Sequence, residues 1–220
     1  MIDSPTTAPL ALALTIIEAG ATVAFALSGL LAAARKRLDA VGVCVVAFLA
    51  AFGGGTLRDV LLDRRPFFWV EHATWLWALL ALCALAMLFL RARHFAPTER
   101  AMQWPDAAGL GLFTAGGTQV ALQAGMPAIV AVLMGVVTAV FGGVLRDIVC
   151  NEIPSAFSDH RPYAVCAFLG GWVVVGAQAA AAPPWAGLLG AVVAAGGLRM
   201  LALATGYVLP QWSTGDGAAE

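Results

Sequence analysis

Hydrophobic and polar positions along this chain divide into long apolar stretches joined by short polar connections. A membrane-spanning helix needs roughly 20 mostly apolar residues. The stretches are continuous, whereas strands of a membrane barrel would alternate in short segments. The pattern therefore predicts an all-α polytopic membrane protein, a single domain over 1–220 with seven transmembrane helices. The predicted spans lie near 10–34, 40–62, 72–91, 105–123, 127–150, 161–182 and 185–205.

The composition agrees with this class. Of 220 residues, 61% are hydrophobic and 11% are charged, whereas a soluble domain carries about 25% charged residues. The net charge is -1 and the chain has one short basic run, RKR at 35–37, so no nucleic-acid partner is expected. Membrane lipids are expected partners. Cysteines without metal-ligand spacing should pack as small hydrophobes. His72 and His160 have no further ligand cluster, so capping is favoured over a metal site, and no cofactor is expected.

Basic residues predict the orientation in a bacterial inner (plasma) membrane. Cytoplasmic loops collect Lys and Arg, and here Arg64 and Arg65 are the main basic residues of the other side. The N-terminus is therefore expected outside and the C-terminus in the cytoplasm. Arg199 is expected to snorkel to the inner surface. No basic residue precedes the first span, so that span is expected to stay in the mature protein. The inner basic residues are Arg35, Lys36, Arg37, Arg91, Arg93, Arg100 and Arg161.

An internal repeat organises the chain. GGTLRDVLLDRRP at 54–66 returns as GGVLRDIVCNEIP at 142–154, a shift of 88 residues that also pairs Glu18 with Asp106. Repeat one, 10–92, and repeat two, 104–182, each contain three spans, an odd number, so the second copy enters the membrane inverted. The seventh helix, 185–205, follows. Inverted repeats commonly place a binding or permeation site between the copies, on discontinuous helices.

Glycines mark the second and fifth spans. Gly53, Gly54 and Gly55, and again Gly142 and Gly143, lack a Cβ and so tolerate a bend or an opening of the helix. Exposed carbonyls at membrane depth require a cavity, and the carboxyl end of a half-helix attracts cations. Both spans are therefore predicted to kink at a cation path. The alternative is that small residues only let helices approach closely.

The repeated motif also places charges inside the membrane. A charged side chain inside a span costs free energy and is usually paired. We therefore expect partners within the bundle for Arg58 with Asp59 and for Arg146 with Asp147. Adjacent helical residues diverge by roughly 100°, so pairing across helices is favoured over pairing with the neighbour. Each guanidinium can lie over the glycines one turn earlier. Two uses remain open, a lining of the pore and an ion-pair lattice between the repeats.

Other polar residues are weaker pore candidates. Glu18 lies within the first span and could attract cations at an outer vestibule, or it could sit near the interface. Asp106 follows Pro105 and is expected to cap the fourth span. Several hydroxyls could line a narrow path, although such groups often bond their own backbone. These hydroxyl candidates are Ser28, Thr114, Thr118 and Thr138.

The motifs GGGTLRDVLL and FGGVLRDIVCNEIP, one in each three-helix repeat before a seventh helix, resemble those of the prokaryotic trimeric intracellular cation (TRIC) channel family. The same bacterial sequences are also grouped as an uncharacterised membrane family with a glycine-transporter label. The TRIC resemblance implies a homotrimer with one pore per subunit, passing potassium and other monovalent cations beside the kinked helices. The second motif has FGGV where the first has GGGT, so the two joints need not open equally.

Two functions are compatible with these features. The leading hypothesis is a potassium-permeable, monovalent cation channel of the inner membrane, with a pore lined around the second and fifth helices. The alternative is a secondary transporter of glycine or a similar small zwitterion, whose carboxylate would face half-helix N-termini at Thr56 and Val144. An enzyme is not expected, because the chain has no HExxH or GxSxG motif. The permeant potassium or sodium ions are then the only ligands expected.

Overall fold

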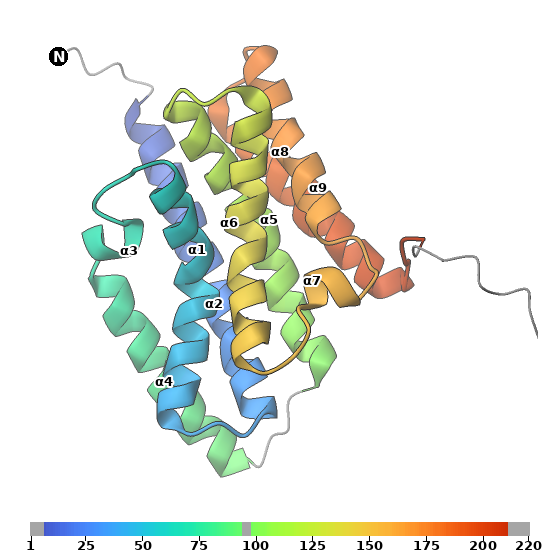
Figure 1. Cartoon of the computed structure of the whole chain (residues 1–220). Helices are drawn as coiled ribbons and strands as arrows, with labels where there is room; N and C mark the ends of the chain where they lie inside the picture. The colour runs from blue at the N-terminus through green and yellow to red at the C-terminus, as the bar shows by residue number, and fades with distance from the viewer. Residues whose placement is uncertain (1–6, 94–97, 211–220) are drawn as a thin grey trace, which may run out of the picture.

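The apolar stretches form seven long helices of 16 to 29 residues in the computed structural model, which describes residues 7–93 and 98–210. Two helices of four residues each, α3 and α7, lie in the connections (Figure 1). The helices of the described residues are α1 (Thr7–Arg35), α2 (Ala40–Leu61), α3 (Phe68–Glu71), α4 (Thr74–Arg93), α5 (Glu99–Gln123), α6 (Ala128–Val149), α7 (Ser155–Ser158), α8 (Ala164–Ala179) and α9 (Pro184–Thr205).

Each predicted span corresponds to one long helix, with one shifted boundary that matters. The fourth span was expected to begin near 105, but α5 begins at Glu99, and Thr98 caps it by accepting a hydrogen bond from the Ala101 amide at 3.2 Å. Pro105 therefore lies inside the helix. The expectation that Asp106 caps this span is wrong, because Thr98 supplies the cap and Asp106 is buried within the helix.

Four of the described helices, α1, α2, α6 and α9, are long and apolar enough to cross a membrane. Helices α4 and α8 contain shorter apolar stretches. Helix α5 carries more polar residues, but it packs against α1, α6, α8 and α9 and so occupies the middle of the bundle (Figure 1). Polar side chains of α5 can face protein and avoid lipid there.

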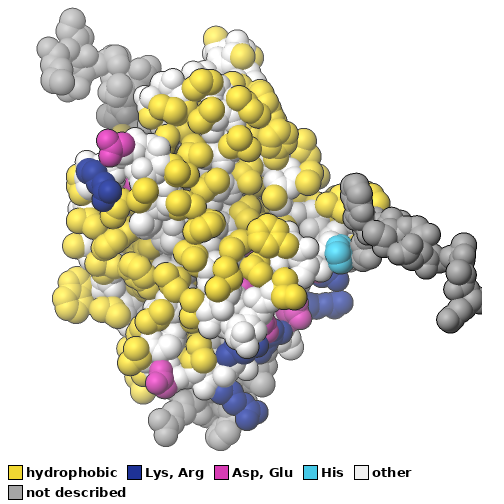
Figure 2. Space-filling view, in the orientation of Figure 1, with side chains coloured by type: hydrophobic (Ala, Val, Ile, Leu, Met, Phe, Trp, Pro, Cys, Tyr) yellow, Lys and Arg dark blue, Asp and Glu magenta, His cyan; other side chains and the backbone are white. Residues whose placement is uncertain are grey.

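The outer surface is apolar between two polar ends. Figure 2 shows hydrophobic side chains over the middle of the molecule and charged side chains towards the ends. Large apolar residues such as Leu12, Ile16 and Val193 are more than half exposed, an arrangement suited to lipid. We call the end where α1 begins the amino end and the end where α9 finishes the carboxyl end, which is the lower end in Figure 1.

Helices α2 and α6 touch through their backbones at the glycines. A Cβ added to Gly54 would lie 2.0 Å from the Thr138 carbonyl oxygen, and one added to Gly142 would lie 2.3 Å from that of Ala50. Real side chains do not approach so closely, so glycine is required at both positions. The two contacts are related by the same 88-residue shift.

Both glycine segments lie within uninterrupted α-helix in this structure. The backbone around Gly53, Gly54 and Gly55 and around Gly142 and Gly143 is therefore not opened in this conformation. The alternative reading, close approach of neighbouring helices, describes what these glycines do here. Bending at these positions stays a prediction about another conformation.

Candidate functional site

The first buried cluster is centred on Arg58 of α2, whose side chain is fully buried. Its Nη1 donates to Glu18 Oε1 of α1 at 3.0 Å, and its Nε donates to Asp59 Oδ1 at 2.9 Å. The Phe68 amide donates to Asp59 Oδ2 at 2.9 Å, and the guanidinium carbon lies 5.4 Å from the centre of the Phe68 ring. The cluster thus ties α1 to α2 and to the start of α3.

The second buried cluster is centred on Arg146 of α6. Its Nη1 donates to Asp106 Oδ1 of α5 and to Ser28 Oγ of α1, while its Nε donates to Asp147 Oδ1 at 2.8 Å. The Ser155 amide donates to Asp147 Oδ2 at 2.8 Å, and so holds the start of α7. Ser28, a weaker candidate in the sequence, therefore belongs to the centre of the site.

The two clusters repeat one design at positions 88 apart, with Glu18 matching Asp106 and Arg58 matching Arg146. The expected pairing across helices is confirmed. The expectation that pairing across helices would be favoured over pairing with the neighbouring aspartate is met only in part, because each Nε also turns back along the helix to that carboxylate. A long arginine side chain spans the angular separation of adjacent residues, while its opposite edge reaches the next helix.

The buried groups of each cluster carry an excess of negative charge. One buried guanidinium faces two carboxylates in each set, which gives these three groups a formal charge of -1 when all are ionised. In the first set, the partly exposed Arg64 Nη1 also lies 4.0 Å from Asp59 Oδ1. Buried charges are tolerated only when paired and hydrogen-bonded, and both arginines meet this condition. A net negative charge in a low-dielectric surrounding attracts cations and repels anions.

Tyr163 and Arg199 complete the second cluster and were not predicted to join it. The Tyr163 hydroxyl donates to Asp106 Oδ2 at 2.6 Å, and the Arg199 guanidinium lies 4.8 Å from the centre of the Tyr163 ring. Arg199 is buried, with Nη2 3.1 Å from Asp159 Oδ2, so the expectation that it snorkels to the surface is wrong. Position 75, the match of Tyr163 in repeat one, is a tryptophan, so the internal repeat gave no signal for this hydroxyl.

The threonine candidates mostly bond their own helices. Thr114 donates to the Leu110 carbonyl at 2.7 Å, and Thr138 donates to the Met134 carbonyl at 2.6 Å. Thr118 is buried with no hydrogen-bond partner among the described residues. Its hydroxyl faces α6 so closely that a Cβ on Gly135 would lie 2.1 Å away. Of these three, only Thr118 keeps a hydroxyl without an intrahelical bond.

A polar vestibule opens at the amino end and leads to the first cluster. It has a volume of about 480 Å³ and is lined by the Glu18 side chain together with polar groups of α1, α5 and the connection after α2. The Glu18 side chain is 9% exposed, so the buried carboxylate retains access to this space. The polar residues of its lining are Thr15, Glu18, Arg64, Glu71, His72 and Gln123.

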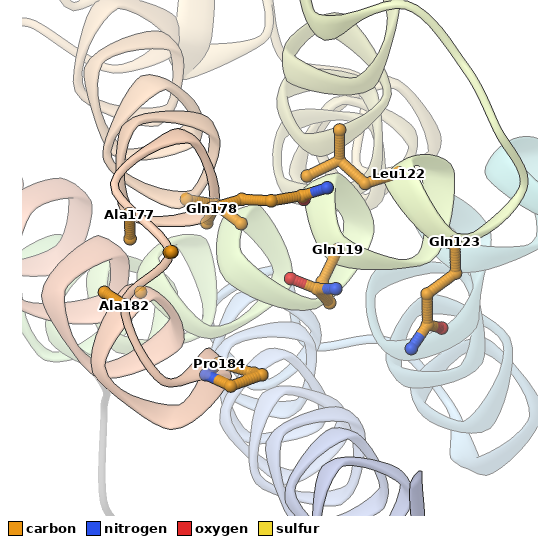
Figure 3. A pocket seen from close by; sticks show the side chains of 10 residues that line it. Gln119, Leu122, Gln123, Ala177, Gln178, Ala182 and Pro184 are labelled. Atoms are coloured by element: carbon orange, nitrogen blue, oxygen red, sulfur yellow. The ribbon is translucent and has the colours of Figure 1, made fainter. Parts of the chain in front are cut away.

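A smaller hollow of about 220 Å³ lies between α5, α8 and α9, also near the amino end (Figure 3). Its polar lining consists of the amide side chains of Gln119, Gln123 and Gln178. None of the residues lining it is charged. Amides alone bind ions more weakly than carboxylates do, so this hollow offers weaker cation ligands than the vestibule beside Glu18 does.

A bundle of apolar helices that shields paired buried charges defines a polytopic α-helical membrane protein. A family model described as "Glycine transporter" matches residues 15–91 and again residues 103–179, two stretches that are also 88 residues apart. Together they cover more than half of the chain, which therefore belongs to this family. A UPF0126 membrane protein of Vibrio cholerae is 37% identical over 174 residues, covering 77% of this chain and 70% of the relative. The UPF0126 inner membrane protein YadS of Escherichia coli K12 is 38% identical over 152 residues, covering 69% and 72%.

Solved structures of TRIC channels share the fold. The TRIC trimeric intracellular cation channel orthologue from Rhodobacter sphaeroides superposes with a TM-score of 0.81 and 34% identity, over 88% of this chain and 98% of that one. A prokaryotic TRIC channel studied in 0.5 M KCl gives a TM-score of 0.82 and 25% identity, over 90% and 100%. The resemblance drawn from the two glycine and Arg-Asp motifs is therefore confirmed.

Proposed function

We propose that this chain is a potassium-permeable channel for monovalent cations, with one pore inside each subunit. The observation that carries the proposal is the placement of two negatively charged clusters within one ring of four helices. Helices α1, α2, α6 and α5 pack in that order around the ring, each against the next. The path would run from the vestibule past Glu18 and Arg58, and then past Arg146 and Asp106.

Likeness to proteins that carry out this activity supports the proposal. The relatives of known structure are named as cation channels, and the excess negative charge of both clusters favours cations over anions. The glycine contact between α2 and α6 lies between the clusters, so conduction requires these helices to separate there. Bending at Gly54 and Gly142 would provide that separation. Because these relatives are named as channels, we propose no enzymatic activity for this chain.

We further infer that the two halves are inverted repeats, so that the seven long helices cross the membrane as three, three and one. Reciprocal contacts support this relation, since Gly54 touches Thr138 while Gly142 touches Ala50. Phe25 stacks on its own repeat mate Phe113, with ring centres 5.5 Å apart. A residue that contacts its own equivalent lies on a two-fold axis. An axis between α1 and α5 relates the halves.

The assembly and orientation follow from the same relatives and from the charges. Structural relatives are named trimeric, and a curated relative is named an inner membrane protein. We propose a homotrimer in the bacterial inner membrane, surrounded by lipid. Most basic residues of the described chain lie at the carboxyl end, which would face the cytoplasm and leave the N-terminus outside. The side chains of Arg91 and Arg93 lie outside the described part.

One observation favours the alternative, a secondary transporter of glycine or a similar zwitterion. Arg64 and Glu18 line the same vestibule and could face a carboxylate and an ammonium group respectively. The half-helix N-termini expected at Thr56 and Val144 do not favour it, because α2 and α6 are continuous there. Their backbone amides are already bonded within the helix.

Planar-bilayer recording of the purified protein under a potassium gradient tests the proposal. A cation channel should give currents that reverse near the potassium equilibrium potential, and Glu18→Gln should move the reversal potential towards zero. Absence of current, together with saturable glycine uptake into liposomes driven by a proton or sodium gradient, would overturn it in favour of the transporter. Empty vesicles and protein-free bilayers serve as controls.

A further inference from the structure

Helices α8 and α9 pack closely over one part of their contact and leave a groove over the other. A Cβ added to Gly170 of α8 would lie 2.7 Å from the Cβ of Ala195, and one added to Gly187 of α9 would lie 2.9 Å from that of Ala177. Such small residues let two helices approach closely. Nearer the carboxyl end, larger side chains of the two helices line an apolar groove, which we call the α8–α9 groove.

The α8–α9 groove belongs to the outer surface of the bundle. Its volume of about 650 Å³ lies within the range of about 300–1,000 Å³ that is usual for small-ligand sites. The Leu209 amide donates to the His160 carbonyl at 2.6 Å, so the chain that follows α9 bounds the groove at the carboxyl end. Four of its lining residues are large, apolar and at least 40% exposed, namely Val165, Leu169, Leu198 and Leu201.

Two arginines share one carboxylate beside the groove. Arg199 Nη2 lies 3.1 Å from Asp159 Oδ2, and Arg161 Nη1 lies 3.3 Å from Asp159 Oδ1. Arg199 Nη1 also donates to the carbonyl oxygen of Pro162, a lining residue, at 3.2 Å. These three ionised groups have a formal charge of +1. Figure 2 shows that positively charged side chains gather towards this end of the molecule.

Arg161 has hydrogen-bonding capacity left for a ligand. Its Nε is buried and has no hydrogen-bond partner among the described residues, although the side chain as a whole is 30% exposed. A buried donor without an acceptor costs free energy, so the guanidinium is stabilised by an acceptor that comes from outside the chain. Arginine binds phosphate groups through parallel N–H donors. The groove therefore has apolar walls and, beside Pro162, a group suited to an anion.

We propose that the α8–α9 groove holds an acyl chain of an anionic phospholipid whose phosphate is bound by Arg161. The groove opens on the surface that faces lipid, and a molecule with an apolar chain and an anionic head matches both its walls and its charge. Basic pockets between membrane helices bind anionic headgroups in this way. No residue of either buried cluster lines the groove, so the site is independent of the proposed channel function.

Native mass spectrometry of the full-length protein, titrated with phosphatidylglycerol, tests the anionic part of the site. Arg161→Gln should weaken binding about tenfold, because it removes a charge-assisted hydrogen bond. Arg37→Gln removes an exposed charge from the connection after α1, at the same end of the bundle, and should leave binding unchanged. An equal loss of affinity in the two variants would show general attraction to surface charge and would overturn the proposal.

A matched pair of tryptophan variants tests the apolar part. Leu201→Trp places a larger side chain in the groove and should weaken phosphatidylglycerol binding about fivefold, because the ring displaces carbon–carbon contacts of the acyl chain. Leu189 lies on the same helix, is also 58% exposed, and does not line the groove. Leu189→Trp should therefore bind as wild type does. Equal affinities of the two tryptophan variants would remove the acyl chain from the groove.

Two further ligands identify what the site recognises. Phosphatidylcholine with the same acyl chains should bind the wild type more weakly than phosphatidylglycerol does, and Arg161→Gln should abolish this difference. Glycerol 3-phosphate has the phosphate without the acyl chains and should not compete. Competition by glycerol 3-phosphate would indicate a site for soluble anions, and equal binding of both lipids by the wild type and by Arg161→Gln would indicate ordinary surrounding lipid. Either result would overturn the proposal.

Discussion

Replacing Gly54 with alanine tests whether the repeated glycines are packing contacts or hinges. The added Cβ would lie 2.0 Å from the Thr138 carbonyl oxygen, so α2 and α6 must separate by about 1 Å merely to reach 3.0 Å, the closest approach that real Cβ atoms show. The obstacle is backbone and cannot rotate away. Overpacking of this kind costs about 1–3 kcal/mol.

Helix propensity changes the stability in the opposite direction, and it provides a control variant. Alanine in place of a helical glycine contributes about 1 kcal/mol of stability. Gly176 lies inside α8, and a Cβ added there meets nothing within 4 Å, so Gly176→Ala should be stabilising. Gly142→Ala, whose Cβ would lie 2.3 Å from the Ala50 carbonyl oxygen, should behave like Gly54→Ala.

Thermal unfolding of the purified protein in detergent, together with potassium flux, measures both effects. If the glycines are packing contacts, Gly54→Ala and Gly142→Ala should melt below wild type while Gly176→Ala melts above it. If the glycines serve only as hinges, Gly54→Ala should be as stable as Gly176→Ala and lose flux because the helix is stiffer. A melting temperature for Gly54→Ala equal to that of Gly176→Ala would refute the packing argument.

Three further predictions concern the buried clusters and the ion pairs of Glu152. Glu18→Gln removes the excess negative charge of the first cluster and should lower the preference for potassium over chloride, measured as a reversal potential closer to zero. Tyr163→Phe leaves an oxygen of Asp106 without its donor and should lower stability by about 1–3 kcal/mol, whereas Tyr207→Phe, at an exposed position, should leave the melting temperature unchanged. Burial alone would raise the pKa of Glu152, but a hydrogen bond from Lys36 and its basic neighbours outweigh that effect and lower the pKa below its usual value of 4.5. The stability that the pairs of Glu152 with Arg35 and Lys36 contribute should therefore be complete above pH 4.5 and lost as the pH falls through the lowered value. A pH series of melting temperatures measures this loss, and Glu152→Gln should not show it.

The positions of the helices could be predicted because each apolar stretch has the length that lipid demands. The boundary that failed, at α5, failed for a physical reason. This helix is shielded by four others, so its first turns need not be apolar, and a search for apolar length misses them. That error placed Asp106 at a helix end. Its match with Glu18, an acid within the first span, already indicated a carboxylate inside the membrane.

The candidate site was predictable where the chain repeats itself and unpredictable where it does not. The shift of 88 residues singled out Arg58 and Arg146 and their carboxylate partners. Tyr163 matches Trp75, and Glu152, which pairs with Arg35 and Lys36, matches Arg64, so self-comparison finds neither. Their signal is of another kind, because the two copies carry residues of different chemical character at matching positions. Such differences indicate where two halves of a repeat have acquired separate roles.

The geometry of α2 and α6 connects the glycines to the arginines. The two helices are antiparallel, and their backbones touch between Ala50 and Gly54 on one helix and between Thr138 and Gly142 on the other. Each arginine follows its glycine by four residues, so Arg58 and Arg146 lie on opposite sides of this contact, one towards each end. No room remains between the two helices, and each guanidinium turns instead to a carboxylate on α1 or α5.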